Sequence, residues 1–304
     1  MKVLSFFFAL CFSFSLLAAE VYYCPMLCEG QKTYPTKTTC PVCGMYLETK
    51  TEGKRPLNTR EYRMDLSSDP LQVKAGEKTT LVFTPRKTKD NSILQPLQIV
   101  HEKPMHLIMV SQELDWFSHE HPEAQKDGSY RLEFTFPKAG NFVLYSDITP
   151  TGDRNQVFPL AIQVQGEKPK ETTPMTWKDN TNAVRKVGDY GVSLTLSPQP
   201  KSSVPITFEF LITKQGKKVQ DLEPYLGAMG HLVILSDDTT QYLHAHPPGH
   251  HHEHGVETHP VKKGPVEKAV KFVTSFPRPG FYKAWMQFSH KGKVETADFT
   301  ILVK

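Results

Sequence analysis

Much of the chain alternates hydrophobic and polar residues with a period of two, which is typical of β-strands that bury one face. Clear examples are the stretches RLEFTF (131–136), ITFEF (206–210) and DFTILV (298–303). Little of the sequence has the 3.6-residue period of an amphipathic helix, and its 24 prolines suit short strands joined by turns. The pattern therefore predicts an all-β protein.

An internal repeat organises these strands. The stretch MHLIMVSQELDWFSHEHP (105–122) matches GHLVILSDDTTQYLHAHP (230–247) at a constant offset of 125. Downstream, FTFPKAGNFVLYSDI (134–148) matches TSFPRPGFYKAWMQF (274–288) at an offset of 140. We infer a duplicated domain, with copy one at 61–166, copy two at 184–304 and a polar linker at 167–183. Units of this length with only short strands predict tandem immunoglobulin-like or cupredoxin-like β-sandwiches.

The first residues, MKVLSFFFALCFSFSLLAAE, have a lysine, an apolar run and two alanines, which is the layout of a secretory signal peptide over 1–19. We expect an exported protein, periplasmic or secreted, with no membrane insertion after cleavage. The net charge is +4 and the basic residues are scattered, so nucleic acid is not an expected partner.

After the expected cleavage, the remaining cysteines form two close pairs inside a small module at 20–50, which a linker at 51–60 follows. The pairs are Cys24 with Cys28 and Cys40 with Cys43. Four thiolates on two turns suit tetrahedral Zn²⁺ or the soft cation Cu⁺. Two structural disulfides are the alternative in an oxidising compartment.

This module resembles the short heavy-metal-binding domain that accompanies copper-exporting ATPases and efflux-pump adaptors. That family reads Tyr-x-Cys-Pro-Met-His-Pro, a spacer, and Cys-Pro-x-Cys-Gly-Met-x-Leu. The matching residues here are Tyr22, Cys24, Pro25, Met26, Cys40, Pro41, Cys43, Gly44, Met45 and Leu47. Leu27 and Cys28 stand where the family has His and Pro. The resemblance implies metal binding by the cysteines, with Met26 and Met45 as further candidate ligands.

Both copies also carry a His-x-His-Pro motif. Residues i and i+2 of a strand point the same way, so each motif presents two imidazoles together, and a third histidine begins the preceding strand. If the segment between forms a hairpin turn, the three can converge on Cu²⁺ or Zn²⁺, with a nearby methionine extending the site toward Cu⁺. The candidates are His106, His119, His121 and Met105 in copy one, and His231, His244, His246 and Met229 in copy two. The alternative is that these histidines hydrogen-bond to the backbone and cap the sandwich.

Copy two alone has a histidine-rich insertion at 248–263. Its candidate ligands are His250, His251, His252 and His254, with His259 beyond them. The insertion is polar and its histidines are unevenly spaced, so we expect weak, exchangeable metal binding or a solvated loop. Elsewhere in the chain, His101 and His290 are weaker candidates.

Copy two resembles a family of exported bacterial proteins with the core LGAMGHLVIL…YLHAHP…FPRPGFYKAWMQF…GKVETADF, found alongside metal-handling modules. This resemblance implies a part in copper or heavy-metal homeostasis. The leading hypothesis is a non-enzymatic exported protein that binds copper, or next zinc, in periplasmic sequestration, delivery or resistance. Metal ions are its expected partners, and a component of a metal efflux system is a further candidate.

Two alternatives remain open at this point. One is a non-catalytic interaction module of an efflux or envelope assembly, in which the cysteines form a structural knot. The other is a mononuclear zinc hydrolase, which is less favoured because Glu120 should point away from His119 and His121 and no other general base is evident.

Overall fold

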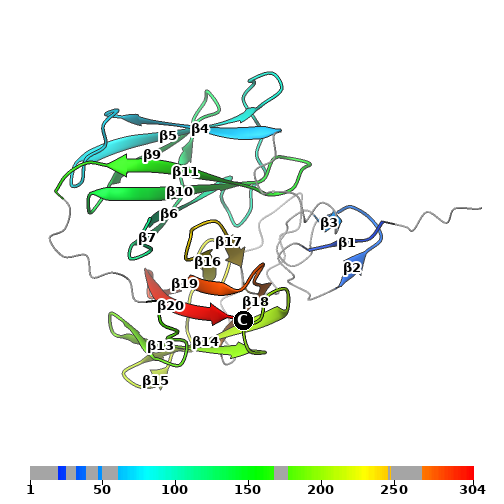
Figure 1. The fold of residues 1–304 in the computed structure, drawn as a ribbon, viewed down its shortest axis with the longest axis vertical. Helices are drawn as coiled ribbons and strands as arrows, with labels where there is room; N and C mark the ends of the chain where they lie inside the picture. Colours follow the sequence, from blue (N-terminus) through cyan, green and yellow to red (C-terminus); the bar gives the residue numbers. More distant parts are fainter. Residues whose placement is uncertain are drawn as a thin grey trace, which may run out of the picture.

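The computed structural model describes residues 20–24, 32–38, 47–49, 61–167, 177–245, 247 and 269–304 (Figure 1). Every regular element within these ranges is a β-strand, which confirms the all-β fold class. The described ranges accordingly contain no helix that could cross a membrane.

The N-terminal module contributes a small antiparallel sheet with the strand order β2-β1-β3. Its strands are β1 (Tyr22–Tyr23), β2 (Thr33–Tyr34) and β3 (Glu48–Thr49). Cys24 and Leu47 are buried beside this sheet. The other candidate ligands of the module lie outside the described residues: Cys28, Cys40, Cys43, Met26 and Met45.

Copy one is a sandwich of two four-stranded sheets, with the orders β4-β5-β9-β8 and β11-β10-β6-β7. The first sheet contains β4 (Tyr62–Asp69), β5 (Lys78–Lys87), β9 (Tyr130–Thr135) and β8 (Glu123–Ala124). The second contains β11 (Gln156–Val164), β10 (Gly140–Ile148), β6 (Met105–Ser111) and β7 (Phe117–Glu120). Leu81 and Phe83 of the first sheet and Leu107 and Leu144 of the second share one buried core.

Copy two repeats this architecture. Its first sheet follows the order β12-β13-β14-β15, with β18 also paired to β14, and its second is β17-β16-β19-β20. The first contains β12 (Arg185–Val187), β13 (Tyr190–Ser197), β14 (Pro205–Lys214), β15 (Lys217–Lys218) and β18 (Val270–Ser275). The second contains β17 (Tyr242–Ala245), β16 (His231–Ser236), β19 (Gly280–His290) and β20 (Lys293–Val303). The sheets that carry the repeated histidines therefore have the same strand order in both copies.

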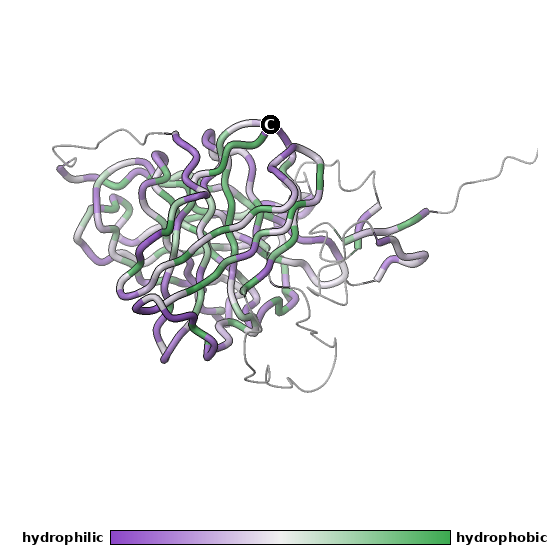
Figure 2. Tube along the Cα trace, turned by 90° about the horizontal axis from the view of Figure 1, so that it is seen from below, coloured by the Kyte–Doolittle hydropathy of each residue, from purple (hydrophilic) through white to green (hydrophobic). Residues whose placement is uncertain are grey.

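The two sandwiches pack against each other through those second sheets. A hydrophobic cluster joins Ile108 and Val110 of β6 to Val233 and Leu235 of β16. The intervening residues of both strands face their own cores, so β6 and β16 are buried along their whole length. In Figure 2 the strands of the interior are largely hydrophobic and many of the surrounding turns are hydrophilic.

Two aromatic pairs give this interface an approximate twofold symmetry. Phe117 of copy one stacks on Trp285 of copy two with ring centroids 4.9 Å apart, and Tyr145 of copy one stacks on Tyr242 of copy two at 5.1 Å. In the repeat, Phe117 is the counterpart of Tyr242 and Tyr145 is the counterpart of Trp285. Each copy therefore presents the same two positions to the other, as in an isologous dimer.

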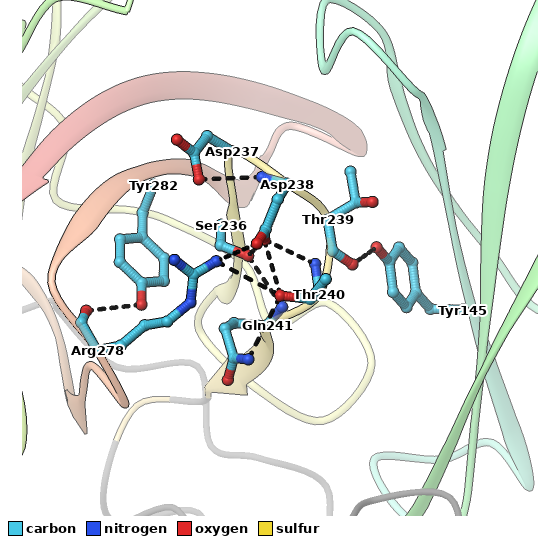
Figure 3. Close-up of polar contacts among 9 residues, drawn as sticks. All are labelled: Tyr145, Ser236, Asp237, Asp238, Thr239, Thr240, Gln241, Arg278 and Tyr282. Carbon is cyan, nitrogen blue, oxygen red and sulfur yellow. Dashed lines mark hydrogen bonds and ion pairs between the residues drawn. The ribbon is translucent and has the colours of Figure 1, made fainter.

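The turn between β16 and β17 adds a polar contact to the interface (Figure 3). The Asp238 carboxylate accepts hydrogen bonds from the Ser236 hydroxyl at 2.6 Å and from the Thr240 amide at 3.1 Å, and it pairs with Arg278. The turn thus holds the Thr239 carbonyl toward copy one, where the Tyr145 hydroxyl donates to it at 2.6 Å.

Truncating the interface should destabilise the protein. We expect Trp285→Ala to lower the free energy of unfolding by about 3 kcal/mol, because it removes a buried ring from its stack on Phe117. Chemical denaturation measures this, with the exposed Leu211→Ala as the control, for which less than about 0.5 kcal/mol is expected. Equal effects of the two substitutions would show that the sandwiches do not pack through this face.

Candidate metal centre

Three histidines of copy one meet at one end of the interface. The hairpin of β6 and β7 pairs Ile108 with His119, so the ring of His106, two residues earlier on β6, lies beside those of His119 and His121. His106 Nδ1 is 3.1 Å from His119 Nε2 and 3.3 Å from His121 Nε2. Ligand atoms of all three lie within 4.8 Å of one another. The hairpin thus brings together the three ring nitrogens that the sequence placed in one candidate site.

Hydrogen bonds on the far sides of the rings decide which nitrogens carry lone pairs. His106 Nε2 lies 2.9 Å from the Val100 carbonyl, which can only accept, so Nε2 donates and Nδ1 has the lone pair. His119 Nδ1 lies 2.7 Å from Gln287 Oε1, and the amide nitrogen of Gln287 lies 3.3 Å from the Thr296 hydroxyl. With the amide in this orientation, His119 Nε2 also has a lone pair.

Two lone pairs therefore face each other across the 3.1 Å between His106 Nδ1 and His119 Nε2. This arrangement is repulsive by itself and becomes attractive when a cation lies between the nitrogens. The backbone carbonyl and amide oxygen behind the two rings are the outer partners that metal-binding histidines usually have. The three histidines of copy one are thus a group that could hold a metal ion.

Copy two builds a matching arrangement from the repeat-equivalent residues. His231, the counterpart of His106, has its Nε2 2.9 Å from the Tyr225 carbonyl. His244, the counterpart of His119, has its Nδ1 3.3 Å from Asp147 Oδ2. The rings of His231 and His244 lie 5.8 Å apart at 40°, against 5.4 Å and 40° for His106 and His119.

The two histidine groups form one cluster between the domains. Ring centroids are 5.5 Å apart for His106 and His244, 5.6 Å for His119 and His231, and 5.4 Å for His119 and His244. Each copy also supplies an acceptor to the other, since Gln287 of copy two binds His119 and Asp147 of copy one binds His244. Neither copy alone would contain this arrangement.

His101 is a member of the cluster that the repeat did not reveal. Its ring centroid lies 6.4 Å from that of His106 and 6.0 Å from that of His231. It sits at φ 47° in a tight turn between Val100 and Lys103, and its counterpart in copy two is Leu226 at φ 51°. In the sequence it is marked only by its position five residues before His106. Comparison of the two copies does not identify it, because copy two has no histidine at that place.

Burial keeps four imidazoles of the cluster neutral: those of His106, His119, His121 and His231. It lowers the pKa of His106 to about 4 and that of His121 to about 3, and neighbouring imidazoles add to the effect. His119 and His231 are fully buried, and their pKa values also lie well below the ordinary one. Neutral imidazole is the form that binds metal, so at neutral pH no proton has to leave these rings first.

Asp147 is the anionic group of the cluster. Burial raises the pKa of its carboxyl, but the hydrogen bond and charge of His244 outweigh burial and hold that pKa below its usual value. The Tyr242 hydroxyl donates to the same oxygen at 3.0 Å. An ionised carboxylate accepts only, so His244 Nδ1 is the donor, and in the neutral form of this ring Nε2 would have the lone pair.

The two methionines have other surroundings. Met105 is fully buried in the core of copy one, on the opposite face of β6 from His106, so the expectation that it extends the histidine site is wrong. Met229 is half-buried and packs against the core of copy two. Met105 and His106 are neighbours on one strand, so their side chains point to opposite faces although they are adjacent in sequence.

The remaining histidine candidates have different outcomes. His246, the counterpart of His121, and the insertion residues His250, His251, His252 and His254 lie outside the described residues. His290 is buried away from the cluster, where its two ring nitrogens lie 2.7 Å from the Tyr190 hydroxyl and 3.0 Å from Asp221.

A family model described as "Domain of unknown function (DUF8832)" matches residues 58–166 and 185–304. The chain belongs to this family. The two matched ranges correspond to the two sandwiches, so the histidine cluster lies where one DUF8832 domain meets the other. No curated protein matches the chain.

Solved structures with some similarity include two adhesins. Over 78% of this chain and 58% of the other, the Yersinia pseudotuberculosis adhesin InvE gives 10% identity and a TM-score of 0.24. The Escherichia coli adhesin FdeC gives 13% identity and a TM-score of 0.23, over 81% of this chain and 65% of FdeC. Elastase-activated Escherichia coli alpha-2-macroglobulin gives 9% identity and a TM-score of 0.25, over 80% of this chain and 20% of the macroglobulin. The chain thus spans less than two thirds of these proteins, and TM-scores this low carry no functional argument.

Removing the Asp147 carboxylate should destabilise the protein even without metal. We expect Asp147→Ala to lower the free energy of unfolding by about 2 to 3 kcal/mol, because the buried donors of His244 and Tyr242 lose their acceptor. The control is Asp189→Ala, which removes an exposed partner of Lys214 and should cost less than about 1 kcal/mol. A denaturation midpoint of Asp147→Ala equal to that of the control would contradict the assigned hydrogen bonds.

Proposed function

We propose that this chain is an exported metal-binding protein that holds copper, with zinc as the next candidate, in periplasmic sequestration, delivery or resistance. The observation that carries the proposal is the convergence of His106 Nδ1, His119 Nε2 and His121 Nε2 in a buried position. Three neutral nitrogen donors are a common ligand set for Cu²⁺ and Zn²⁺.

The surroundings of these donors support binding rather than simple packing. A core histidine is normally satisfied by donating one nitrogen and accepting at the other. Here the donating nitrogens of His106 and His119 are already used on Val100 and Gln287, and their accepting nitrogens face each other. A metal ion between these nitrogens would make their contact attractive, whereas without one His121 Nε2 can donate to His106 Nδ1 at 3.3 Å.

Copper is favoured over zinc for two reasons. Nitrogen sites generally bind Cu²⁺ more tightly than Zn²⁺. In addition, the N-terminal module resembles domains that accompany copper exporters, and its thiolates would suit Cu⁺. The module would then be the soft site and the histidine centre a separate nitrogen site.

The histidine centre is tested in a background that removes the other candidate sites. This background is the full chain without an affinity tag, with the four module cysteines changed to Ser and the insertion histidines changed to Asn. We expect it to bind Cu²⁺, and His121→Ala to weaken binding by at least the roughly 10- to 100-fold that loss of an outer-shell partner costs, since one of three direct donors is lost. His121 is only partly buried, so the substitution should be tolerated.

Titration calorimetry and metal analysis after dialysis measure the binding. His290→Gln is the matched control, because it removes a buried imidazole outside the cluster and should leave the affinity unchanged. A background protein that takes up neither Cu²⁺ nor Zn²⁺ would refute the proposal for this centre.

The cysteine module is tested separately with Cu⁺. We expect the four Cys→Ser substitutions in the otherwise unchanged chain to abolish the tightest Cu⁺ equivalent, because thiolates are the softest ligands available. Competition with a coloured Cu⁺ chelator under argon measures this. The metal assignment fails if stoichiometry and affinity are unchanged, or if thiol counting finds all four cysteines oxidised in the native protein.

A further inference from the structure

We propose that the interface binds two metal ions side by side, the second held by His231 and His244, so that the two domains share one dinuclear centre. This inference rests on the proposed function and adds a second metal position to it. It also makes the centre a property of the pair of domains, since each position depends on a residue of the other copy.

The first argument is the repeated geometry. His106 with His119 and His231 with His244 occupy equivalent positions on equivalent hairpins, with Ile108 paired to His119 and Val233 paired to His244. The angle between the rings is 40° in both pairs, and the ring centroids are 5.4 Å apart in copy one and 5.8 Å apart in copy two. A geometry that offers nitrogens to a cation in one copy offers them in the other.

The second argument is the hydrogen bonding behind the copy-two rings. The Tyr225 carbonyl accepts from His231 Nε2, and Asp147 accepts from His244 Nδ1. In the neutral rings the lone pairs therefore lie on His231 Nδ1 and His244 Nε2, the same atoms as on their counterparts in copy one. Unlike the amide of Gln287, the carboxylate of Asp147 has no alternative orientation that would donate, which fixes this tautomer more firmly.

The third argument is the distance between the two groups. Across the domains, the rings of His119 and His244 lie 5.4 Å apart, no farther than His106 and His119 within copy one. Two-metal sites hold their ions about 3.5 to 4 Å apart. One ion bound to each pair would therefore interact directly with the other.

Asp147 makes this centre asymmetric. Its negative charge stands behind His244, whereas the neutral Gln287 stands at the equivalent place behind His119. The carboxylate orients its histidine and would offset part of the charge of a second cation. The two positions should therefore fill with different affinities.

The experiment uses the full-chain background described above, loaded with Cu²⁺. We expect two copper equivalents and an electron paramagnetic resonance spectrum broadened by dipolar coupling, with a half-field signal. His244→Gln should reduce the stoichiometry to one equivalent and abolish the half-field signal. His290→Gln should retain both.

The outcomes separate the two proposals. A background protein that binds no metal refutes the proposed function. One bound Cu²⁺ equivalent with an uncoupled spectrum is consistent with the copy-one site and overturns the dinuclear centre. Two bound Cu²⁺ equivalents without a half-field signal would also overturn the dinuclear centre. The background protein decides this alone, so the test holds even if His244→Gln does not fold.

Discussion

The packing of one sandwich face on another is the constraint on which the rest of the structure depends. β6 and β16 are buried on both faces, and this places the residues between their core positions in an environment without water. Hydrophobic residues fill most of that interface, and histidines occupy its end. Because charge is costly there, the imidazoles are held neutral and must satisfy their nitrogens within the interface.

The interface also explains why the hydrogen bonds of the histidines cross between domains. On β10 and β19, the residues that face outward from each sandwich core reach the histidines of the other copy. Asp147 and Gln287 occupy equivalent places on these strands and serve as acceptors for His244 and His119. The two copies share the position and the role, while the chemical group is a carboxylate in copy one and an amide in copy two.

Much of this architecture could be predicted from the sequence. The alternating patterns identified the strands, and the constant offset identified the repeat. The hairpin expected between the histidines is present as β6 and β7, and it brings His106 beside His119 and His121. These features depend on local periodicity and on comparison of the chain with itself. The assignment of Met105 to the site failed because neighbours on a strand point to opposite faces.

The docking of the copies was missed, although the sequence contained a signal for it. LIMV in β6 and LVIL in β16 are continuous apolar runs rather than alternating ones, and such runs indicate strands buried on both faces. The acceptors Asp147 and Gln287 could be found only by knowing which face meets which. His101 was only a weak candidate for a related reason, because it reaches the cluster through a turn that has no histidine in copy two.

The approximate symmetry of the stacked pairs Phe117–Trp285 and Tyr145–Tyr242 has a consequence for the origin of this arrangement. A single-copy ancestor using the same face would associate as a symmetric homodimer, and its assembly would depend on protein concentration. Joining the copies in one chain makes the encounter intramolecular, with an effective concentration on the order of millimolar for a short flexible connection. The covalent link also frees the two halves to diverge, as the aspartate and glutamine at equivalent positions have done.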